Sequence, residues 1–172
     1  MTILVTGGSK CGKSRFAEQL LHDFKGRKFY VATMQPYGSD AQEAIARHRE
    51  MRRTKGFETL EQYTDLAALS IPDASAVLVE CIGNLCANEM FSALPPTDPT
   101  EKICTAIRTL SKQSECLVIV TNEVGSDGIP YDSYTQDYIR ILHTVNRELT
   151  TIADTVYECV FGIPILLKGT VS

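Results

Sequence analysis

The sequence has 172 residues, of which 44% are hydrophobic and 22% are charged, and its formal net charge is -4. This composition is that of an ordinary globular protein and excludes a fibrous or disordered chain. The acidic balance argues against a nucleic-acid-binding protein with a broad basic face. Because no signal peptide begins the chain and no apolar run approaches the roughly 20 residues that span a bilayer, we expect one cytoplasmic domain over residues 1–172 without membrane insertion.

Short apolar runs rich in β-branched residues alternate with amphipathic stretches along the chain. The predicted strands are Thr2–Thr6, Lys28–Thr33, Ala76–Cys81, Cys116–Thr121, Thr155–Phe161 and a short Pro164–Lys168. The predicted helices are Lys13–Phe24, Asp40–Arg53, Leu66–Leu69, Ile82–Phe91, Thr100–Lys112 and Tyr134–Ala153. Strands that are apolar nearly throughout and alternate with helices indicate an α/β fold, in which helices cover both faces of a mostly parallel sheet.

Six cysteines are spread over the chain without a recognisable metal-binding pattern. No Cys-x-x-Cys pair occurs, and the three histidines do not extend the cysteines into a metal-ligand set. Free thiols in a reducing cytosol are the simpler interpretation.

The clearest motif is G-x-x-x-x-G-K-[ST], which joins the first strand to the first helix. Glycines let the backbone N–H groups turn inward around phosphates, and the helix that follows adds its positive dipole end. In this pattern Lys13 contacts the β- and γ-phosphates, and the Ser14 hydroxyl coordinates Mg²⁺. The motif predicts a P-loop NTPase (RecA-like) fold, with nucleotide contacts from Gly7, Gly8, Ser9, Lys10, Cys11, Gly12, Lys13 and Ser14.

A carboxylate follows a neighbouring buried strand, as the same chemistry requires. The run Ala76–Val79 is wholly apolar and ends at Glu80. P-loop proteins place such an acid beside Mg²⁺, so we expect Ser14 and Glu80 to be the metal-side residues. The alternative is an ordinary strand-end carboxylate that faces solvent.

One histidine lies within a basic segment of this otherwise acidic chain. His48 is surrounded by five cations between positions 47 and 55, and a helix would place His48 and Arg52 on one face. A neutral imidazole there could attack phosphorus while the arginines neutralise the developing charge. Composition alone favours a solvated arginine-rich face, and His22 and His143 are more simply packing or surface histidines.

Taken together, these motifs resemble the bifunctional adenosylcobinamide kinase/adenosylcobinamide-phosphate guanylyltransferase family of cobalamin biosynthesis. The likeness runs nearly end to end and includes the P-loop, Tyr30–Thr33, His48 with Arg49 and Arg52, and the stretches Glu58–Glu61, Leu78–Cys81, Thr121–Gly125, Asn146 and Gly162–Pro164. The resemblance implies a kinase step on adenosylcobinamide with GTP (or ATP) and Mg²⁺. It also implies GMP transfer from GTP to the resulting phosphate through a guanylyl-histidine.

The resemblance assigns roles to particular residues of this chain. It implies that His48 is the nucleophile and that Lys13 assists catalysis. It adds nucleotide contacts from Ala32, Thr33, Met34, Arg49, Glu50, Met51, Arg52, Glu61 and Glu80. It further implies a homo-oligomer, a trimer, whereas nothing in the residues themselves fixes the number of subunits.

The sequence departs from the family pattern at several positions near the predicted site. Ala44 replaces a common arginine, Phe57 a frequent tryptophan and Arg147 a usual glutamine, and the loop at 126–128 is more polar than expected. These changes affect substrate details more than reaction class. Asn122 and Glu123 either act close to the P-loop or serve the geometry of a turn alone, and both alternatives are open at this point.

Two other functions remain open at this point. A small-molecule P-loop kinase with an incidental His48 would transfer a γ-phosphate without any covalent nucleotidyl intermediate. A nucleotide-dependent switch protein would bind GTP and a partner, although the sequence lacks a guanine-specificity motif of the Asn-Lys-x-Asp kind.

Overall fold

The computed structural model describes residues 1–36, 50 and 52–170. Within them, seven strands form one sheet in the order β3-β2-β4-β5-β1-β6-β7. The strands are β1 (Thr2–Thr6), β2 (Lys28–Ala32), β3 (Phe57–Glu61), β4 (Ala76–Glu80), β5 (Cys116–Val120), β6 (Thr155–Val160) and β7 (Ile163–Lys168). All neighbouring strands are parallel except β7, which pairs antiparallel with β6 at the edge. The predicted mostly parallel sheet is therefore confirmed.

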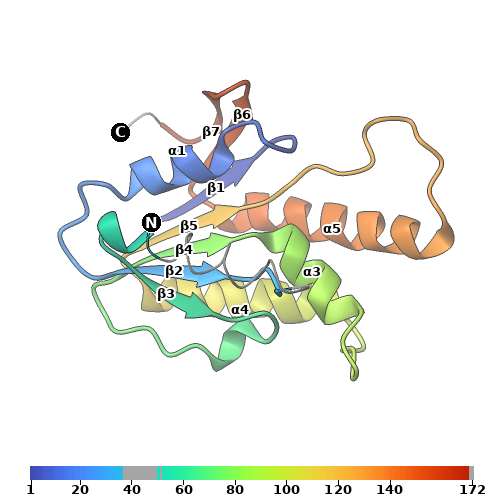
Figure 1. The fold of residues 1–172 in the computed structure, drawn as a ribbon, viewed down its shortest axis with the longest axis horizontal. Coiled ribbons are helices and arrows are strands. Elements are labelled where there is room, and N and C mark those ends of the chain that lie inside the picture. The colour runs from blue at the N-terminus through green and yellow to red at the C-terminus, as the bar shows by residue number, and fades with distance from the viewer. Residues whose placement is uncertain (37–49, 51, 171–172) are drawn as a thin grey trace.

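Helices cover both faces of this sheet (Figure 1). They are α1 (Lys13–Leu20), α3 (Ile82–Met90), α4 (Pro99–Gln113) and α5 (Ser133–Ile152), with a short 3-10 helix, η1 (Leu66–Ala68). On one face α1 packs Ala17 against Val5, Leu78 and Val118. On the other face α3, α4 and α5 pack side chains such as Leu85 against the opposite side of the same strands.

The core explains why the strands lack the alternating pattern of a half-exposed sheet. Both faces of the central strands β4 and β5 are buried, so every residue from Ala76 to Val79 and from Cys116 to Val120 is shielded from solvent. Fully burying one such aliphatic side chain stabilises the fold by about 1.5–3 kcal/mol. This layered core places the carboxyl ends of β1, β2, β4 and β5 along one edge of the sheet.

The sequence missed one strand and set some boundaries differently. The edge strand β3 was not predicted, because only Phe57 is buried along it and two of its five residues are glutamates. The first helix ends at Leu20 rather than Phe24, where N–H groups at Leu21 and His22 bond three residues back in a tightened turn. The predicted helix over Asp40–Arg53 lies almost wholly outside the described residues, although residues 50 and 52–54 are helical.

Capping side chains fix where the later helices begin. Asp98 precedes α4 and accepts a hydrogen bond from the Glu101 N–H at 3.1 Å, and Pro99 takes the first helical position. Asp132 caps α5 in the same way, through the Thr135 N–H at 3.0 Å.

Among the described residues, no helix combines the length and hydropathy needed to cross a bilayer.

Candidate nucleotide site

The phosphate-binding motif forms a tight loop between β1 and α1. Gly7 has φ 138° and Gly12 has φ 100°, which are conformations that side chains rarely adopt. A Cβ atom on Gly7 would lie 2.5 Å from the Cys159 carbonyl oxygen, so this position has no room for one. The turn between β6 and β7 supports the loop from outside, because the Gly162 N–H donates to the Cys11 carbonyl at 2.8 Å.

Lys13 is held inside the loop at the start of α1. Its side chain is buried, and its ammonium group donates to the Gly7 carbonyl at 2.9 Å and to the Gly8 carbonyl at 2.5 Å. A buried cation requires such partners, since desolvation without them is costly. The loop therefore fixes the ammonium at the first turn of α1, where backbone N–H groups and the helix dipole also favour an anion.

Glu80, at the end of β4, is in direct contact with the loop. The Ser14 hydroxyl donates to one oxygen of the Glu80 carboxylate, and the Tyr30 hydroxyl donates to the other at 2.7 Å. Glu80 is therefore a partnered carboxylate, and its role beside Mg²⁺ stays a prediction. β5 lies between β4 and β1 in the sheet, so the contact crosses one intervening strand.

The sheet register brings a second predicted acid to the same level. Ala32 is the register partner of Glu61 on one side and of Glu80 on the other. In-register residues of parallel strands project to the same face, so the two glutamates flank Ala32. Glu61 is exposed and accepts a hydrogen bond from the Tyr63 hydroxyl at 3.0 Å.

Thr33 fixes the backbone where β2 and β4 end. Its buried hydroxyl donates to the Cys81 carbonyl at 2.8 Å and accepts from the Cys81 N–H at 2.7 Å. Its own N–H donates to the Glu80 carbonyl at 3.0 Å. Thr33 therefore acts on the site through the main chain of β4, and this role was not evident in the sequence.

A cleft of about 260 Å³ opens beside these groups. It brings together five of the residues predicted from the sequence, namely Ser14, Ala32, Met34, Arg52 and Glu80. It also contains five that the sequence analysis missed, namely Glu18, Tyr30, Lys55, Cys81 and Asn84. Helical spacing from Ser14 to Glu18 and strand spacing from Ala32 to Tyr30 would have indicated two of them.

The basic segment reaches this cleft through Arg52. The Arg52 guanidinium lies 3.8 Å from the centre of the Tyr30 ring. Nearby, Lys55 forms an ion pair with Glu18 on α1, whereas Glu50 pairs with Arg53 at 2.8 Å on the surface. His48, Arg49 and Met51 lie outside the described residues, as does Ala44.

The other two histidines lie outside this cleft. His22 has 81% of its side chain exposed and contacts Asp23. A ring nitrogen of His143 lies 2.9 Å from the Val124 carbonyl oxygen. Neither residue contributes to the cleft lining.

The segment after β5 lies against the P-loop, as its position in the sequence suggested. The Glu123 N–H donates to the Gly7 carbonyl at 3.4 Å. Asn146 on α5 holds this segment by accepting from the Thr121 hydroxyl at 2.6 Å and donating to the Asn122 carbonyl at 3.1 Å. Glu123 contacts the P-loop through its main chain and Asn122 contacts Asn146 through its carbonyl, and neither residue lines the cleft.

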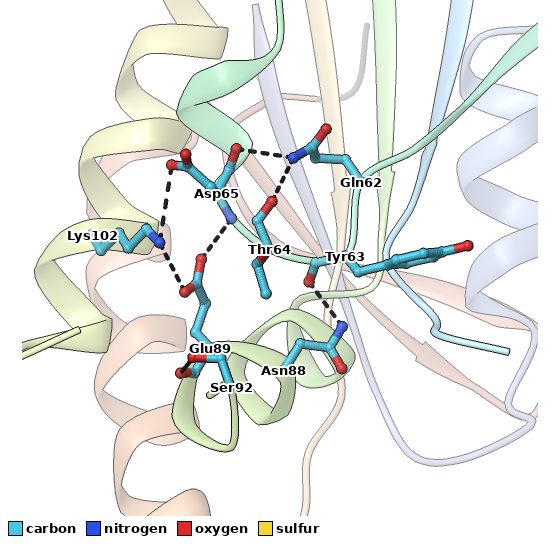
Figure 2. Close-up of polar contacts among 8 residues, drawn as sticks. All are labelled: Gln62, Tyr63, Thr64, Asp65, Asn88, Glu89, Ser92 and Lys102. Atoms are coloured by element: carbon cyan, nitrogen blue, oxygen red, sulfur yellow. Dashed lines mark hydrogen bonds and ion pairs between the residues drawn. The ribbon is translucent and has the colours of Figure 1, made fainter. Parts of the chain in front are cut away.

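Helix α3 braces the loops that follow β2 and β3, and Figure 2 shows its contacts with the loop after β3. Asn88 donates to the Tyr63 carbonyl at 2.8 Å and to the Thr33 carbonyl at 2.7 Å. Beside it, the buried Glu89 accepts from the Asp65 N–H at 2.7 Å and pairs with Lys102 of α4 at 2.9 Å. This network holds the ends of two strands that carry predicted site residues. No sequence motif indicated the network.

The oxygen groups next to the loop fit a magnesium ion that a nucleotide brings with it. Mg²⁺ takes oxygen ligands, usually one or two from protein and the rest from phosphates and water. The Ser14 hydroxyl and the Glu80 carboxylate supply that donor set side by side. No group of three or more His, Cys, Asp or Glu side chains that could hold a metal alone occurs in the described part of the chain.

The loop, its lysine and the partnered acid on an α/β sheet define a P-loop nucleotide-binding protein. Residues 3–167 match the family model described as cobinamide kinase / cobinamide phosphate guanyltransferase, and the chain belongs to this family. It is 31% identical over 183 residues to the bifunctional adenosylcobalamin biosynthesis protein CobU of Escherichia coli, and 32% identical to that of Salmonella typhimurium. Each match covers 98% of this chain and all of the relative.

Solved structures support the fold at lower sequence similarity. A DnaB-like replicative helicase superposes with a TM-score of 0.51 at 10% identity, covering 91% of this chain and 46% of the helicase chain. An ATPase from a bacterial type III secretion system gives a TM-score of 0.51 at 12% identity and is half covered. These P-loop ATPases confirm the predicted RecA-like fold, and at this identity they indicate the fold alone.

Proposed function

We propose that this chain is a bifunctional enzyme of cobalamin biosynthesis that phosphorylates adenosylcobinamide and then converts the product to adenosylcobinamide-GDP. The observation that carries the proposal is the contact of Ser14 with Glu80 in a cleft that Arg52 also lines. Ser14 belongs to the phosphate-binding loop, and Arg52 follows His48 by four positions in the sequence. The family match and the names of the bifunctional relatives support both activities.

In the kinase step, the substrate hydroxyl oxygen attacks the γ-phosphorus of GTP (or ATP). The bond to the β–γ bridging oxygen breaks, GDP (or ADP) leaves, and the hydroxyl proton is released. The loop N–H groups and Lys13 stabilise the negative charge on the phosphates, which is the main contribution of a protein to this reaction. Mg²⁺, held by Ser14 and Glu80, would add charge neutralisation between the phosphates.

In the transfer step, a ring nitrogen of His48 attacks the α-phosphorus of GTP and pyrophosphate leaves. A phosphate oxygen of adenosylcobinamide phosphate then attacks the same phosphorus, the P–N bond breaks, and His48 is regenerated. Two displacements replace one difficult transfer, which is the usual advantage of a covalent intermediate. We propose that Arg52, which lines the cleft, neutralises phosphate charge there, and that Arg49 has the same function.

The test is to incubate the enzyme with Mg²⁺ and GTP labelled at the α-phosphate, then to denature it and measure bound label. We expect an acid-labile, alkali-stable adduct on wild type that is absent from His48→Ala. His22→Ala is the matched control, since this exposed histidine lies outside the cleft, and it should keep the adduct. GTP labelled at the γ-phosphate should leave no label on the protein.

A folded, GTP-binding wild type without an adduct would contradict the transfer step. It would leave the monofunctional small-molecule kinase, an alternative that the names of the bifunctional relatives do not favour. A nucleotide switch would show neither the adduct nor phosphorylation of adenosylcobinamide. An assay of phosphate transfer from γ-labelled GTP to adenosylcobinamide distinguishes the monofunctional kinase from the nucleotide switch.

Self-association and location belong to the same proposal. The edge strand β7 exposes Ile163, Ile165 and Leu167, with Phe161 in the turn before it. Apolar side chains along an unpaired strand edge are typical of an interaction surface, which supports a homo-oligomer. Light scattering after gel filtration would test the expected trimer. The cytoplasmic location and the absence of nucleic-acid binding stay predictions.

A further inference from the structure

Tyr30 lies at the floor of the cleft and contacts groups on both of its sides. Its hydroxyl donates at 2.7 Å to the oxygen of Glu80 that Ser14 does not occupy. The two carboxylate oxygens are therefore held by separate donors, one from the P-loop and one from β2. If the Ser14 hydroxyl turns toward a nucleotide-bound ion, the Tyr30 bond remains to orient the acid.

The aromatic ring of Tyr30 makes the second connection. The Arg52 guanidinium lies over its face, 3.8 Å from the ring centre. The edge-to-face contact with Phe57, at 6.2 Å and 87°, fixes the ring from the side of β3. A guanidinium over an aromatic face is attracted by the ring quadrupole, so the ring determines where the Arg52 side chain lies.

The Tyr30 side chain is anchored in the core on the α1 face of the sheet. The residue is only 6% exposed, and its bond to Glu80 is partly buried, which limits the access of water. The contact is therefore a stable link between two parts of the site.

We infer that Tyr30 is a positioning residue that couples the metal-side acid Glu80 to Arg52, and so ties the phosphate-binding centre to the segment that carries out guanylyl transfer. Its hydroxyl orients Glu80, and its ring orients Arg52. This inference rests on the proposed function for its second half only. The first half concerns nucleotide binding with Mg²⁺ and stands without the transfer reaction.

Two substitutions separate the two contacts. Tyr30→Phe removes the hydroxyl and keeps the ring beneath Arg52, whereas Tyr30→Leu removes both. Tyr157→Phe is the matched control, because it removes a phenol hydroxyl from the same face of the sheet, where Tyr157 packs against Phe16 away from Glu80. Thermal unfolding of each variant verifies that it is folded, and Tyr30→Phe keeps the test valid if the leucine variant unfolds.

The first readout is the affinity for a fluorescent GTP analogue, measured in excess EDTA and across a Mg²⁺ titration. In EDTA we expect Tyr30→Phe to bind like wild type. The gain in affinity that Mg²⁺ gives should fall about tenfold, because groups that orient a metal ligand have effects of this size. An unchanged Mg²⁺ dependence in Tyr30→Phe would overturn the assignment to Glu80.

The second readout is the interaction between Tyr30 and Arg52. In a double-mutant cycle of Tyr30→Leu with Arg52→Met, the effects on GTP affinity should deviate from additivity by about threefold or more. The rate of adduct formation should fall further in Tyr30→Leu than in Tyr30→Phe. Additive effects on GTP affinity would overturn the coupling of Tyr30 to Arg52. Absence of an adduct on wild type would contradict the proposed guanylyl transfer, and the double-mutant cycle on affinity would still test the coupling.

Discussion

The buried ion pair between Glu89 and Lys102 allows a sharp test of what braces the site. Glu89 has 3% of its side chain exposed and Lys102 has 34%, and their charged atoms lie 2.9 Å apart. Lys102→Met would leave a buried carboxylate without its cation. Removing one partner of a fully buried pair costs about 3–5 kcal/mol, and the partial exposure of Lys102 lowers our expectation to about 2 kcal/mol.

The informative variant is the double substitution Lys102→Met with Glu89→Gln. The glutamine keeps an oxygen that accepts the Asp65 N–H bond, but it no longer buries an unpaired charge. We therefore expect the double variant to lose only about 1 kcal/mol relative to wild type and to be more stable than Lys102→Met alone. The second substitution should restore about half of the stability that the first removes.

Urea denaturation measures this difference directly. For a slope of about 2 kcal/mol per molar, the double variant should unfold at a urea concentration about 0.5 M higher than Lys102→Met. Lys112→Met is the control on the same helix, since this exposed lysine should change stability by less than about 0.5 kcal/mol. A double variant less stable than the single one would refute the argument that the unpaired charge dominates.

Three further predictions follow from the described contacts. Lys13→Met should lower GTP affinity by about 100-fold or more, because the ammonium that we expect to contact the β- and γ-phosphates is lost, whereas Arg15→Met should leave the affinity within about threefold in the same titration. A thiol reagent at pH 8 should label one cysteine of the folded protein and six in urea, since Cys11 is the one thiol of the six that is not buried, and Cys11→Ser should abolish the fast reaction. Burial raises the pKa of Cys86 from 9.0 to about 12. Unfolded chains release this proton first, so the urea midpoint should fall as pH rises from about 9 toward 11, and less so in Cys86→Ala.

The parts of the fold that the sequence predicted are those with strong local signals. The central strands are apolar because both faces are buried, and the P-loop glycines occupy positions that the backbone geometry demands. The edge strand β3 carries neither signal. Of its residues only Phe57 is buried, so its sequence shows no alternation of hydrophobic and polar residues. It pairs with β2 through main-chain hydrogen bonds, which do not require particular side chains.

The sequence predicted five of the ten residues that line the cleft, but it did not predict their arrangement. Motif spacing identified Ser14 and Glu80 separately, and 66 positions separate them. That they touch depends on β5 lying between β1 and β4, which is a property of strand order. Tyr30 was missed because a tyrosine inside an apolar strand is usually a core residue, and only the finished cleft shows its hydroxyl against Glu80.

A single nucleotide site for both reactions is the last expectation that the structure supports. The P-loop motif occurs once in the sequence, and the cleft of about 260 Å³ beside it brings Ser14, Glu80 and Arg52 together. An analogue with a methylene group between the α- and β-phosphates can donate its γ-phosphate but cannot form the guanylyl adduct. It should therefore support the kinase reaction and competitively inhibit adduct formation from GTP, with an inhibition constant within about threefold of its own dissociation constant. Adduct formation that persists at saturating analogue would require a second nucleotide site and would refute the shared cleft.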